Sequence, residues 1–287
     1  MVQSFAKTVA VVAGAMFFST LAVNALDMRG YLAQSLLGMV FFGQSEDTGP
    51  CPVHMVLVDT ALEPFCIDQY EVSAGKNCPY ADPASINETA LNIADKDCAP
   101  VSEQRRVPWR HISAIDSEQV CSRAGKRLPT AGEWYKAALG TRDPAGAYQS
   151  DECNVASNRA DGVAPTGNGL RCVSDVGAYD MIGNVWEWVG EEVVDGAWQG
   201  GALPASGYVS GADLYGVAFE TGTIPNDTFH GDRFWSDFTV RAGMMRGGYY
   251  NSGGSAGIFS IYAASPRTFT GDAVGFRCVS AVRERGN

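Results

Sequence analysis

The stretch RGGYYNSGGSAG, residues 246–257, together with the closing GFRC, residues 275–278, decides how this chain folds and what its folded surface can do. Both segments are framed by arginine and glycine, as strands that support an enzyme's active site often are. The residues inside the frame are Tyr, Asn, Ser and Gly, which supply neither a thiol nor a charged metal ligand. The segment therefore predicts a contact surface on fixed backbone supports, with an ordinary Gly/Ser-rich loop as the alternative.

The supports themselves are expected to be structural. Arg246 and Arg277 are predicted to fold inward onto carboxylates or carbonyls, because a guanidinium needs several acceptors when it is buried. Gly247 and Gly248 permit close approach of neighbouring strands, and Phe276 is expected in the core.

The composition bounds the class of protein. A chain of 287 residues with 46% hydrophobic residues can bury a large core. Its net charge is -11 and it has no Lys/Arg-rich run, so its field repels phosphate backbones and anionic membrane surfaces. Nucleic acid is therefore excluded as a partner.

The N-terminus indicates export. Residues 8–26 carry no charge, Lys7 precedes them, and Val23, Asn24 and Ala25 match a signal-peptidase site. We expect residues 1–25 to be a signal peptide, or else an uncleaved membrane anchor, with 26–50 as a lead-in segment and 51–287 as the domain. Either alternative makes the protein secreted or attached to the cell surface, with membrane attachment only through the N-terminus.

Eight cysteines suit that compartment, because an even number in an exported chain is most simply a set of disulfides. There is no C-x-x-C, and His54, His111 and His230 are scattered, which argues against a zinc site. A Cys51–Cys66 bridge would staple a hairpin made by residues 54–59 and 65–73. Cys78 and Cys98 enclose a loop rich in Pro, Asn and Asp.

Two main helices are predicted, and after residue 153 only short strands and loops. The first spans 113–123 and ends at Gly125, which suits a left-handed cap. The second begins at Thr130, whose hydroxyl forms a capping box with Glu133. Residues 191–239 are expected to form a large aromatic loop. This order of elements predicts an α+β fold.

Several blocks resemble, in the same order, the formylglycine-generating enzyme family, also called the sulfatase-modifying factor domain. They are CIDQYEVS, VPWRHISAIDSEQVCSRAGKRLPTAGEWYKAALG, GAYDMIGNVWEWV, MRGGYY and GFRCV, and they cover most of residues 55–279. The resemblance implies a variant of the C-type lectin fold: α+β, loop-rich, with a small twisted antiparallel sheet and two main helices. It also implies a Cys121–Cys278 disulfide, which leaves Cys153 to pair with Cys172.

The block DMIGNVWEW resembles a calcium site of this family. Carboxylates and oriented carbonyls on a tight turn suit an oxygen-preferring cation. Carried over by position, the calcium ligands are Asp180, the carbonyls of Gly183 and Val185, and Glu187. The alternative is that Glu187 pairs with an arginine. A second family site at Asn154 and the Val155 carbonyl lacks clear further ligands.

In the family's aerobic enzymes, two cysteines after the RGG strand bind copper and convert a substrate cysteine to formylglycine. The corresponding positions here are Ser252 and Gly257, so no copper is expected. A Ser252 nucleophile would also lack a neighbouring base. An oxidoreductase or other modifying enzyme acting on a peptide cysteine or a small molecule remains the alternative function.

The frame also resembles the variable region of diversity-generating retroelement proteins, which display a mutable ligand-binding surface on this fold. Tyrosine gives rigid contact area, and Ser, Gly and Asn give adaptable hydrogen bonding. We therefore expect residues 249–273, within a variable-type region of 246–279, to bind an external protein or glycan. The predicted ligand-binding residues are Tyr249, Tyr250, Asn251, Ser252, Ser255, Phe259, Ser260, Tyr262, Arg267, Phe269 and Trp235.

Overall fold

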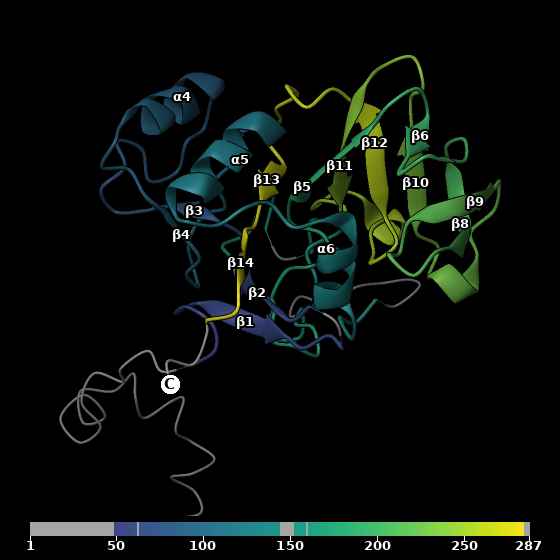
Figure 1. Ribbon diagram of the computed structural model, residues 1–287, viewed down its shortest axis with the longest axis horizontal. Helices are drawn as coiled ribbons and strands as arrows, with labels where there is room; N and C mark the ends of the chain where they lie inside the picture. The colour runs from purple at the N-terminus through teal and green to yellow at the C-terminus, as the bar shows by residue number, and fades with distance from the viewer. Residues whose placement is uncertain (1–48, 62, 144–151, 159, 284–287) are drawn as a thin grey trace, which may run out of the picture. The chain divides into compact units, whose positions relative to one another are not determined.

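The computed structural model describes residues 49–61, 63–143, 152–158 and 160–283 (Figure 1). The chain divides after Thr48, and the second part, from Gly49, is the one described. The predicted signal peptide or anchor and the lead-in segment up to residue 48 lie outside the described residues. Within the described part, none of the helices is both long enough and apolar enough to cross a membrane.

A seven-stranded sheet forms the centre of the domain, in the order β13-β5-β11-β12-β10-β8-β9. Its central strands are β5 (Trp186–Val193), β11 (Ala242–Arg246) and β12 (Ile261–Ser265), and β11 pairs antiparallel with both of its neighbours. The sheet is not wholly antiparallel as expected: β13 (Val274–Phe276) runs parallel to β5, and β10 (Arg233–Ser236) runs parallel to β12. The two strands of each parallel pair are not consecutive in the chain: β11 lies between β10 and β12, and β6 to β12 lie between β5 and β13.

The prediction of a large loop at residues 191–239 is wrong, because this segment contains strands. They are β6 (Ala197–Trp198), β7 (Gly201–Ala202), β8 (Gly207–Ala212), β9 (Ala218–Gly222) and β10, with the short 3₁₀ turn η1 (Asp227–Phe229). Strands β8, β9 and β10 form one side of the sheet, away from α4 and α5 (Figure 1). All three strands are short, β8 and β9 contain glycine, and the β8–β9 pairing shifts register, so no clean period-two pattern marks β8 and β9.

A smaller sheet of β1 (Met55–Val58), β2 (Phe65–Asp68) and β14 (Val279–Ala281) lies at the other end of the domain. The predicted hairpin is confirmed, since β1 and β2 pair antiparallel. A two-stranded ladder, β3 (Ser73–Ala74) with β4 (Pro100–Val101), follows. The C-terminal strand β14 pairs with β2 and so ties the end of the chain to its beginning.

Both predicted helices form where the caps placed them. Helix α5 (Ala114–Arg123) begins after Ser113, and Gly125 beyond its end has the positive φ of a left-handed cap. Helix α6 (Ala131–Ala138) has the full capping box between Thr130 and Glu133.

A third helix, α4 (Ile86–Ala94), forms inside the segment that was expected to be a loop. Ser85 accepts a hydrogen bond from the Glu88 amide, and the Glu88 carboxylate accepts one from Ala84. This S-x-x-E pattern is a helix start signal that the Pro, Asn and Asp residues around it obscured. The Asn92 side chain then binds both backbone groups of Tyr80 and fastens the helix to its loop.

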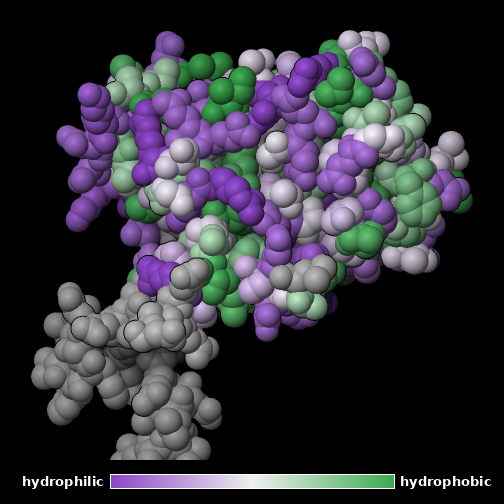
Figure 2. All heavy atoms as spheres, viewed as in Figure 1, coloured by the Kyte–Doolittle hydropathy of each residue, from purple (hydrophilic) through white to green (hydrophobic). Residues whose placement is uncertain are grey.

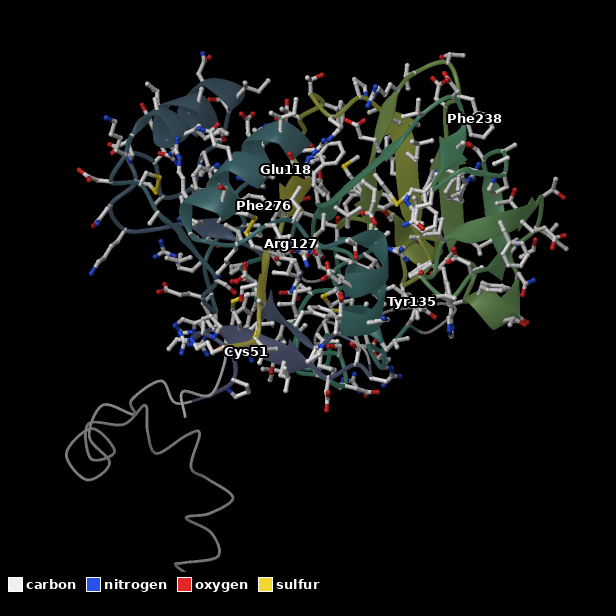
Figure 3. All side chains as sticks on the ribbon, viewed as in Figure 1. Cys51, Glu118, Arg127, Tyr135, Phe238 and Phe276 are labelled. Carbon is white, nitrogen blue, oxygen red and sulfur yellow. A yellow bond between two sulfur atoms is a disulfide. The ribbon has the colours of Figure 1, made fainter. Side chains whose placement is uncertain are left out.

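The core has two main parts, one on each side of the sheet. The part between α5 and the β5–β13 pair includes Trp109, Trp188 and Phe276, which are fully buried (Figure 3). The other part packs α6, through Trp134, against β11 and β12. All four expected disulfides are confirmed: Cys51–Cys66, Cys78–Cys98, Cys121–Cys278 and Cys153–Cys172.

Candidate functional site

The aromatic face is a patch on one side of the seven-stranded sheet, made by Tyr208, Arg233, Trp235, Tyr262 and Trp186. Trp235 is in register with Tyr262 on the next strand, and Arg233 with Tyr208. The Trp186 ring centroid lies 5.5 Å from that of Trp235 and 5.9 Å from that of Tyr262. All but Trp186 are partly exposed. Aromatic side chains from the four strands β5, β8, β10 and β12 thus meet in one surface.

The segment after β11 is a fixed turn beside this face. Gly247 and Gly248 both have positive φ, and a Cβ on them would lie 2.8 Å from the Met181 carbonyl and 2.5 Å from the Ala256 Cβ. The predicted close approach is confirmed. The Ser252 hydroxyl accepts from the Tyr249 amide at 3.0 Å, so it closes the turn.

Arg246 folds inward as predicted and binds only carbonyls. It is fully buried and donates to the carbonyls of Ala131, Tyr215, Gly216 and Ile258. Burial away from water lowers its pKa to about 10, which still leaves the guanidinium charged at neutral pH. Its role is to join α6, the β8–β9 turn and the segment after η2 (Gly253–Ser255).

Arg277 folds inward onto a carboxylate. Its Nε and Nη2 atoms lie 2.7 and 2.6 Å from the two oxygens of Glu187, and both side chains are buried. Glu187 Oε2, the oxygen that accepts from Arg277 Nε, also accepts from Trp134 Nε1 at 2.7 Å. Such a two-pronged buried pair fixes β5 against the closing GFRC segment.

The predicted calcium ligands fit only in part. Both oxygens of Glu187 are taken by Arg277 and Trp134, so this carboxylate does not fit a calcium ligand in this conformation, and the arginine pairing is the alternative that the geometry supports. Asp180 is buried, with an oxygen that accepts from the Gly167 amide at 2.5 Å. Burial, and then the nearby Asp180 and Glu187 carboxylates, raise the pKa of Glu71 well above its ordinary value. Calcium at Asp180 and the Gly183 and Val185 carbonyls stays a prediction.

The second, weaker family site has one matching feature. Asn154 is buried, and its Oδ1 has no hydrogen-bond partner within the described part of the chain. The Val155 carbonyl, however, accepts from the Gly253 amide at 2.7 Å. Among the described residues, no group of three or more His, Cys, Asp or Glu side chains is arranged so that it could hold a metal ion.

Two carboxylates fill the space beside Gly257. A Cβ at Gly257 would lie 2.0 Å from Asp232 Oδ1 and 2.3 Å from Asp143 Oδ2. Asp232 is fully buried and accepts from the Phe259 amide at 2.7 Å, while its Oδ1 finds no donor among the described groups. Burial, and then the neighbouring Asp143, raise the pKa of Asp232 well above its ordinary value. The position therefore has no room for any side chain.

Most predicted ligand-binding residues have part of their surface exposed. These are Tyr249, Tyr250, Asn251, Ser252, Ser255, Tyr262, Phe269 and Trp235. Tyr262 and Trp235 belong to the aromatic face, and Tyr249 packs against the same buried cluster as these two residues. Tyr249 and Tyr250 meet edge to face at 5.2 Å.

Three predicted ligand contacts need correction. Ser260 is fully buried, and its hydroxyl donates to the Ser255 carbonyl. Phe259 packs between Tyr135 and Phe229 at ring distances of 5.5 and 5.1 Å (Tyr135 is labelled in Figure 3). Arg267 pairs with Glu118 and Glu192, so its charge is neutralised within the protein. All three residues lie in the segments that flank β12, where no periodic pattern shows which side chains are buried or paired.

Sequence reasoning missed Tyr208, Arg233 and Trp186 as members of this face. Tyr208 and Arg233 lie within the segment 191–239 that is predicted as a large loop, and Trp186 lies within the block that resembles a calcium site. The alternation Arg233, Phe234, Trp235, with Phe234 buried and its neighbours partly exposed, is a period-two signal that could have identified β10.

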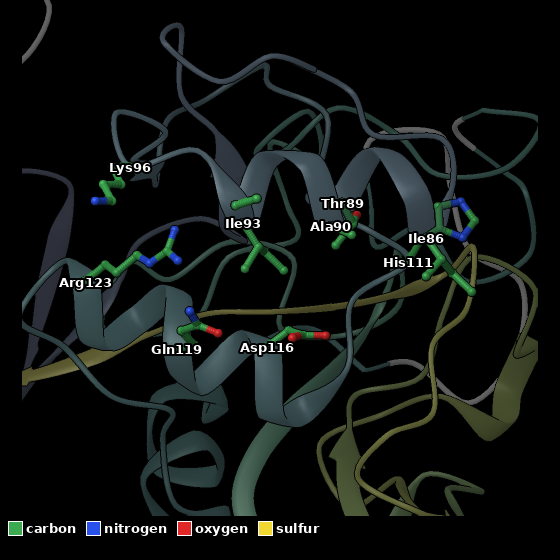
Figure 4. Close-up of a pocket in the computed structure, with 10 residues that line it drawn as sticks. Ile86, Thr89, Ala90, Ile93, Lys96, His111, Asp116, Gln119 and Arg123 are labelled. Atoms are coloured by element: carbon green, nitrogen blue, oxygen red, sulfur yellow. The ribbon is translucent and has the colours of Figure 1, made fainter.

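A separate groove lies between α4 and α5, with a volume near 380 Å³. Ile86 and His111 lie at one end, and Lys96 and Arg123 at the other (Figure 4). It contains none of the predicted site residues. On the face shown in Figure 2, hydrophobic side chains occur as separate patches among hydrophilic ones, so no single large apolar patch marks a site in that view.

Comparison with known proteins identifies a family. The sequence profile described as "Sulfatase-modifying factor enzyme 1-like domain" matches residues 36–282, most of the chain. This match confirms the fold class expected from the sequence, the α+β formylglycine-generating-enzyme variant of the C-type lectin fold.

Curated relatives match over shorter stretches. The chain is 34% identical over 107 residues to "Inactive C-alpha-formylglycine-generating enzyme 2" of Bos taurus, covering 32% of this chain and 35% of that protein. It is 30% identical over 106 residues to "Formylglycine-generating enzyme" of Thermomonospora curvata, covering 31% and 34%. With "Hercynine oxygenase" of Mycobacterium tuberculosis it shares 32% over 94 residues, covering 28% and 21%. The matches thus span about a third of these relatives' length or less.

Solved structures with a similar course of the chain include "Major Tropism Determinant M1 Variant", with a TM-score of 0.43 and 18% identity over 82% of this chain and 55% of that one. "Treponema denticola variable protein 1" gives a TM-score of 0.41 and 13% identity over 80% of this chain and 100% of that one.

Proposed function

Since this chain belongs to the sulfatase-modifying factor enzyme 1-like family, we propose that it keeps the family's scaffold and uses it to bind a ligand rather than to oxidise a substrate. In this proposal the protein is exported and stabilised by disulfides, and it binds an external protein or glycan. The binding surface is the aromatic face together with Tyr249, Tyr250 and Asn251.

The observation that carries the proposal is the packing around Gly257. One of the two family copper cysteines falls at this position, and a side chain there would collide with the carboxylates of Asp232 and Asp143. Asp232 cannot easily move aside, because it is fully buried and bonded to the Phe259 amide. The space of a thiolate is therefore occupied by two hard oxygen groups, which suit copper(I) poorly.

No other cysteine can replace the missing pair. All eight cysteines of the chain are joined in the four disulfides, and none is free. A disulfide sulfur is not a thiolate and does not bind copper(I) as one. Four disulfides are also typical of proteins that fold outside the cytoplasm, which supports the export part of the proposal.

The composition of the aromatic face supports a binding role. Tyrosine, tryptophan and arginine are enriched among the residues that supply most of the binding energy at protein interfaces. Tyrosine and tryptophan give large contact area with few rotatable bonds, and arginine gives a planar fork of hydrogen-bond donors. The face offers all three, and the turn beside it adds exposed Asn251. The Ser252 hydroxyl already holds the backbone of the turn, so little conformational entropy is lost on binding.

The test separates binding from oxidation. The purified protein is titrated with copper(I) under anaerobic conditions, and then incubated with O₂ and a cysteine-containing peptide that is followed by mass spectrometry. The formylglycine-generating enzyme of Thermomonospora curvata serves as the positive control. We expect neither stoichiometric copper binding nor a change in peptide mass; stoichiometric copper with peptide oxidation would establish the modifying-enzyme alternative instead.

Diversification by a retroelement is a further, conditional part of the proposal. It requires a reverse transcriptase gene nearby and a near-identical template repeat of the last hundred or so bases of the gene. Sequencing the flanking DNA decides this point. A gene without either element belongs to a binding protein with a fixed surface.

A further inference from the structure

Arg233 is a cation of the aromatic face that the protein itself does not neutralise. Its guanidinium carbon lies 5.4 Å from the ring centroid of Tyr208 and 5.7 Å from that of Trp235. Within the described residues it forms no ion pair and no side-chain hydrogen bond, and its Nε is buried without a partner. Stacking on two rings orients the guanidinium but satisfies none of its donors.

Arg267, which the sequence predicts as a ligand-binding residue, differs from Arg233 because its charge is already paired. Arg267 is held by Glu118 and Glu192. Arg241, just before β11, is likewise paired with Glu192. Arg233 is thus a charged group with unused donors in a protein whose net charge is -11.

The acidic residue next to Arg233 in sequence does not face it. Successive strand residues point to opposite sides of a sheet, and Asp232 is buried against the Phe259 amide. The residues in register with β10 near Arg233 are Tyr208 and Gly207 on one side, with Trp235 facing Tyr262 on the other. None of these carries a negative charge.

Resting on the proposed function, we infer that Arg233 binds a carboxylate of an acidic protein ligand, an Asp or Glu side chain. The planar guanidinium offers parallel donors that match a carboxylate, and such a charge-assisted pair would use the Nη donors that no acceptor of the described residues engages. Trp235 and Tyr262 lie alongside to contact the apolar residues that flank the acid.

The same geometry favours a protein over a glycan. Sugars bind aromatic residues by stacking on an open ring face, but the guanidinium of Arg233 already lies over the rings of Tyr208 and Trp235. Trp235 also meets Trp186 at an interplanar angle of 89°, which covers more of the indole pair. The groups that remain available to a ligand are the Arg233 guanidinium and the edges of the aromatic rings. Arginine and aromatic side chains are common together in the hot spots of protein interfaces.

The experiment uses the full chain, immobilised and panned with a random dodecapeptide phage library. Selected peptides are synthesised and their affinities measured for wild type, Arg233→Gln, Arg233→Lys and Arg241→Gln. Arg241→Gln is the matched control, because it removes the same charge from an exposed arginine that is already paired with Glu192. A panel of neutral and uronate-containing oligosaccharides is tested in parallel.

We expect selected peptides to be enriched in Asp or Glu beside an aromatic or aliphatic residue. Arg233→Gln should weaken binding tenfold or more, Arg233→Lys should weaken it less, and Arg241→Gln should leave it unchanged. Peptides without acidic enrichment that bind Arg233→Gln as well as wild type contradict the inference while the proposed function stands. Oligosaccharide binding without peptide binding also overturns it, and the absence of any binder contradicts the proposed function itself.

Discussion

Gly257 occupies one of the two positions at which the family resemblance implies a copper-binding cysteine, and its packing gives a direct prediction. Gly257→Ala places a Cβ against the buried carboxylates of Asp232 and Asp143 and should reduce the free energy of unfolding by about 2 kcal/mol or more. Gly254→Ala is the control, because a Cβ there meets nothing and the change should stay within about 0.5 kcal/mol. Urea unfolding of both variants checks this, and equal stabilities would show that the carboxylates yield easily.

Asp232 predicts an unusual dependence of stability on pH. Its folded-state pKa is raised by burial and by Asp143, so the folded protein holds a proton that the unfolded chain releases above the ordinary carboxyl pKa. Its contribution to stability is therefore complete at low pH and is lost as pH rises through the folded-state value. Asp232→Asn mimics the protonated form and should remove this loss.

The measurement is the free energy of unfolding in urea at several pH values from acid to mildly alkaline. Glu71 has a raised pKa of the same sign, so wild type and Asp232→Asn are compared at each pH rather than wild type alone. The variant should gain on wild type as pH rises. A constant difference would mean that Asp232 is ionised throughout.

Glu187 allows the calcium prediction to be tested against the ion pair. Glu187→Gln leaves Arg277 buried without its carboxylate and should cost about 3–5 kcal/mol. Glu118→Gln breaks a more exposed pair with Arg267 and should cost about 1 kcal/mol or less. Both losses should be the same in calcium and in EDTA. If calcium stabilises wild type and Glu187→Gln alone abolishes that gain, Glu187 is a calcium ligand after all.

At the scale of elements, the strongest local signal was the capping box of α6. The Thr130 hydroxyl accepts from the Glu133 amide, and the Glu133 carboxylate accepts from the Thr130 amide. Thr130→Ala should therefore reduce the free energy of unfolding by about 1 kcal/mol. Thr268→Ala, at an exposed position, is the control and should be neutral; equal effects in urea unfolding would show that the cap is dispensable.

Element prediction succeeded where local chemistry dominates and failed where it does not. Capping residues predicted where α5 and α6 begin, and Gly125 predicted where α5 ends, because these signals depend on only a few neighbouring residues. Strands β8 to β10 were read as loop, because their pairing depends on partners far along the chain and not on an internal pattern. Helix α4 had its start signal at Ser85 and Glu88, but loop-forming neighbours hid it.

At the scale of the whole molecule, the Cys121–Cys278 disulfide closes 157 residues of chain and joins α5 to the C-terminal GFRC segment. On the chain-entropy estimate its removal costs about 5 kcal/mol, against about 3 kcal/mol for the shorter loop of Cys78–Cys98. The paired variants Cys121→Ala/Cys278→Ala and Cys78→Ala/Cys98→Ala test this by urea unfolding. The reverse order of stabilities would show that the long loop is already constrained in the unfolded chain.

The sequence by itself determined the α+β fold class, all four disulfides, the two capped helices and the inward-facing arginines. Each of these depends on residue identity at a fixed spacing, or on a resemblance carried by contiguous motifs. It also determined that the copper positions hold Ser252 and Gly257.

Only the tertiary structure decided which side chains form the candidate surface. It buried Ser260, paired Arg267 with two glutamates, and brought Tyr208, Arg233 and Trp235 beside Tyr262. It also placed Asp143 and Asp232 against Gly257 from distant parts of the chain. The physical reason is that exposure, charge compensation and collision depend on distances between strands whose pairing no local pattern encodes.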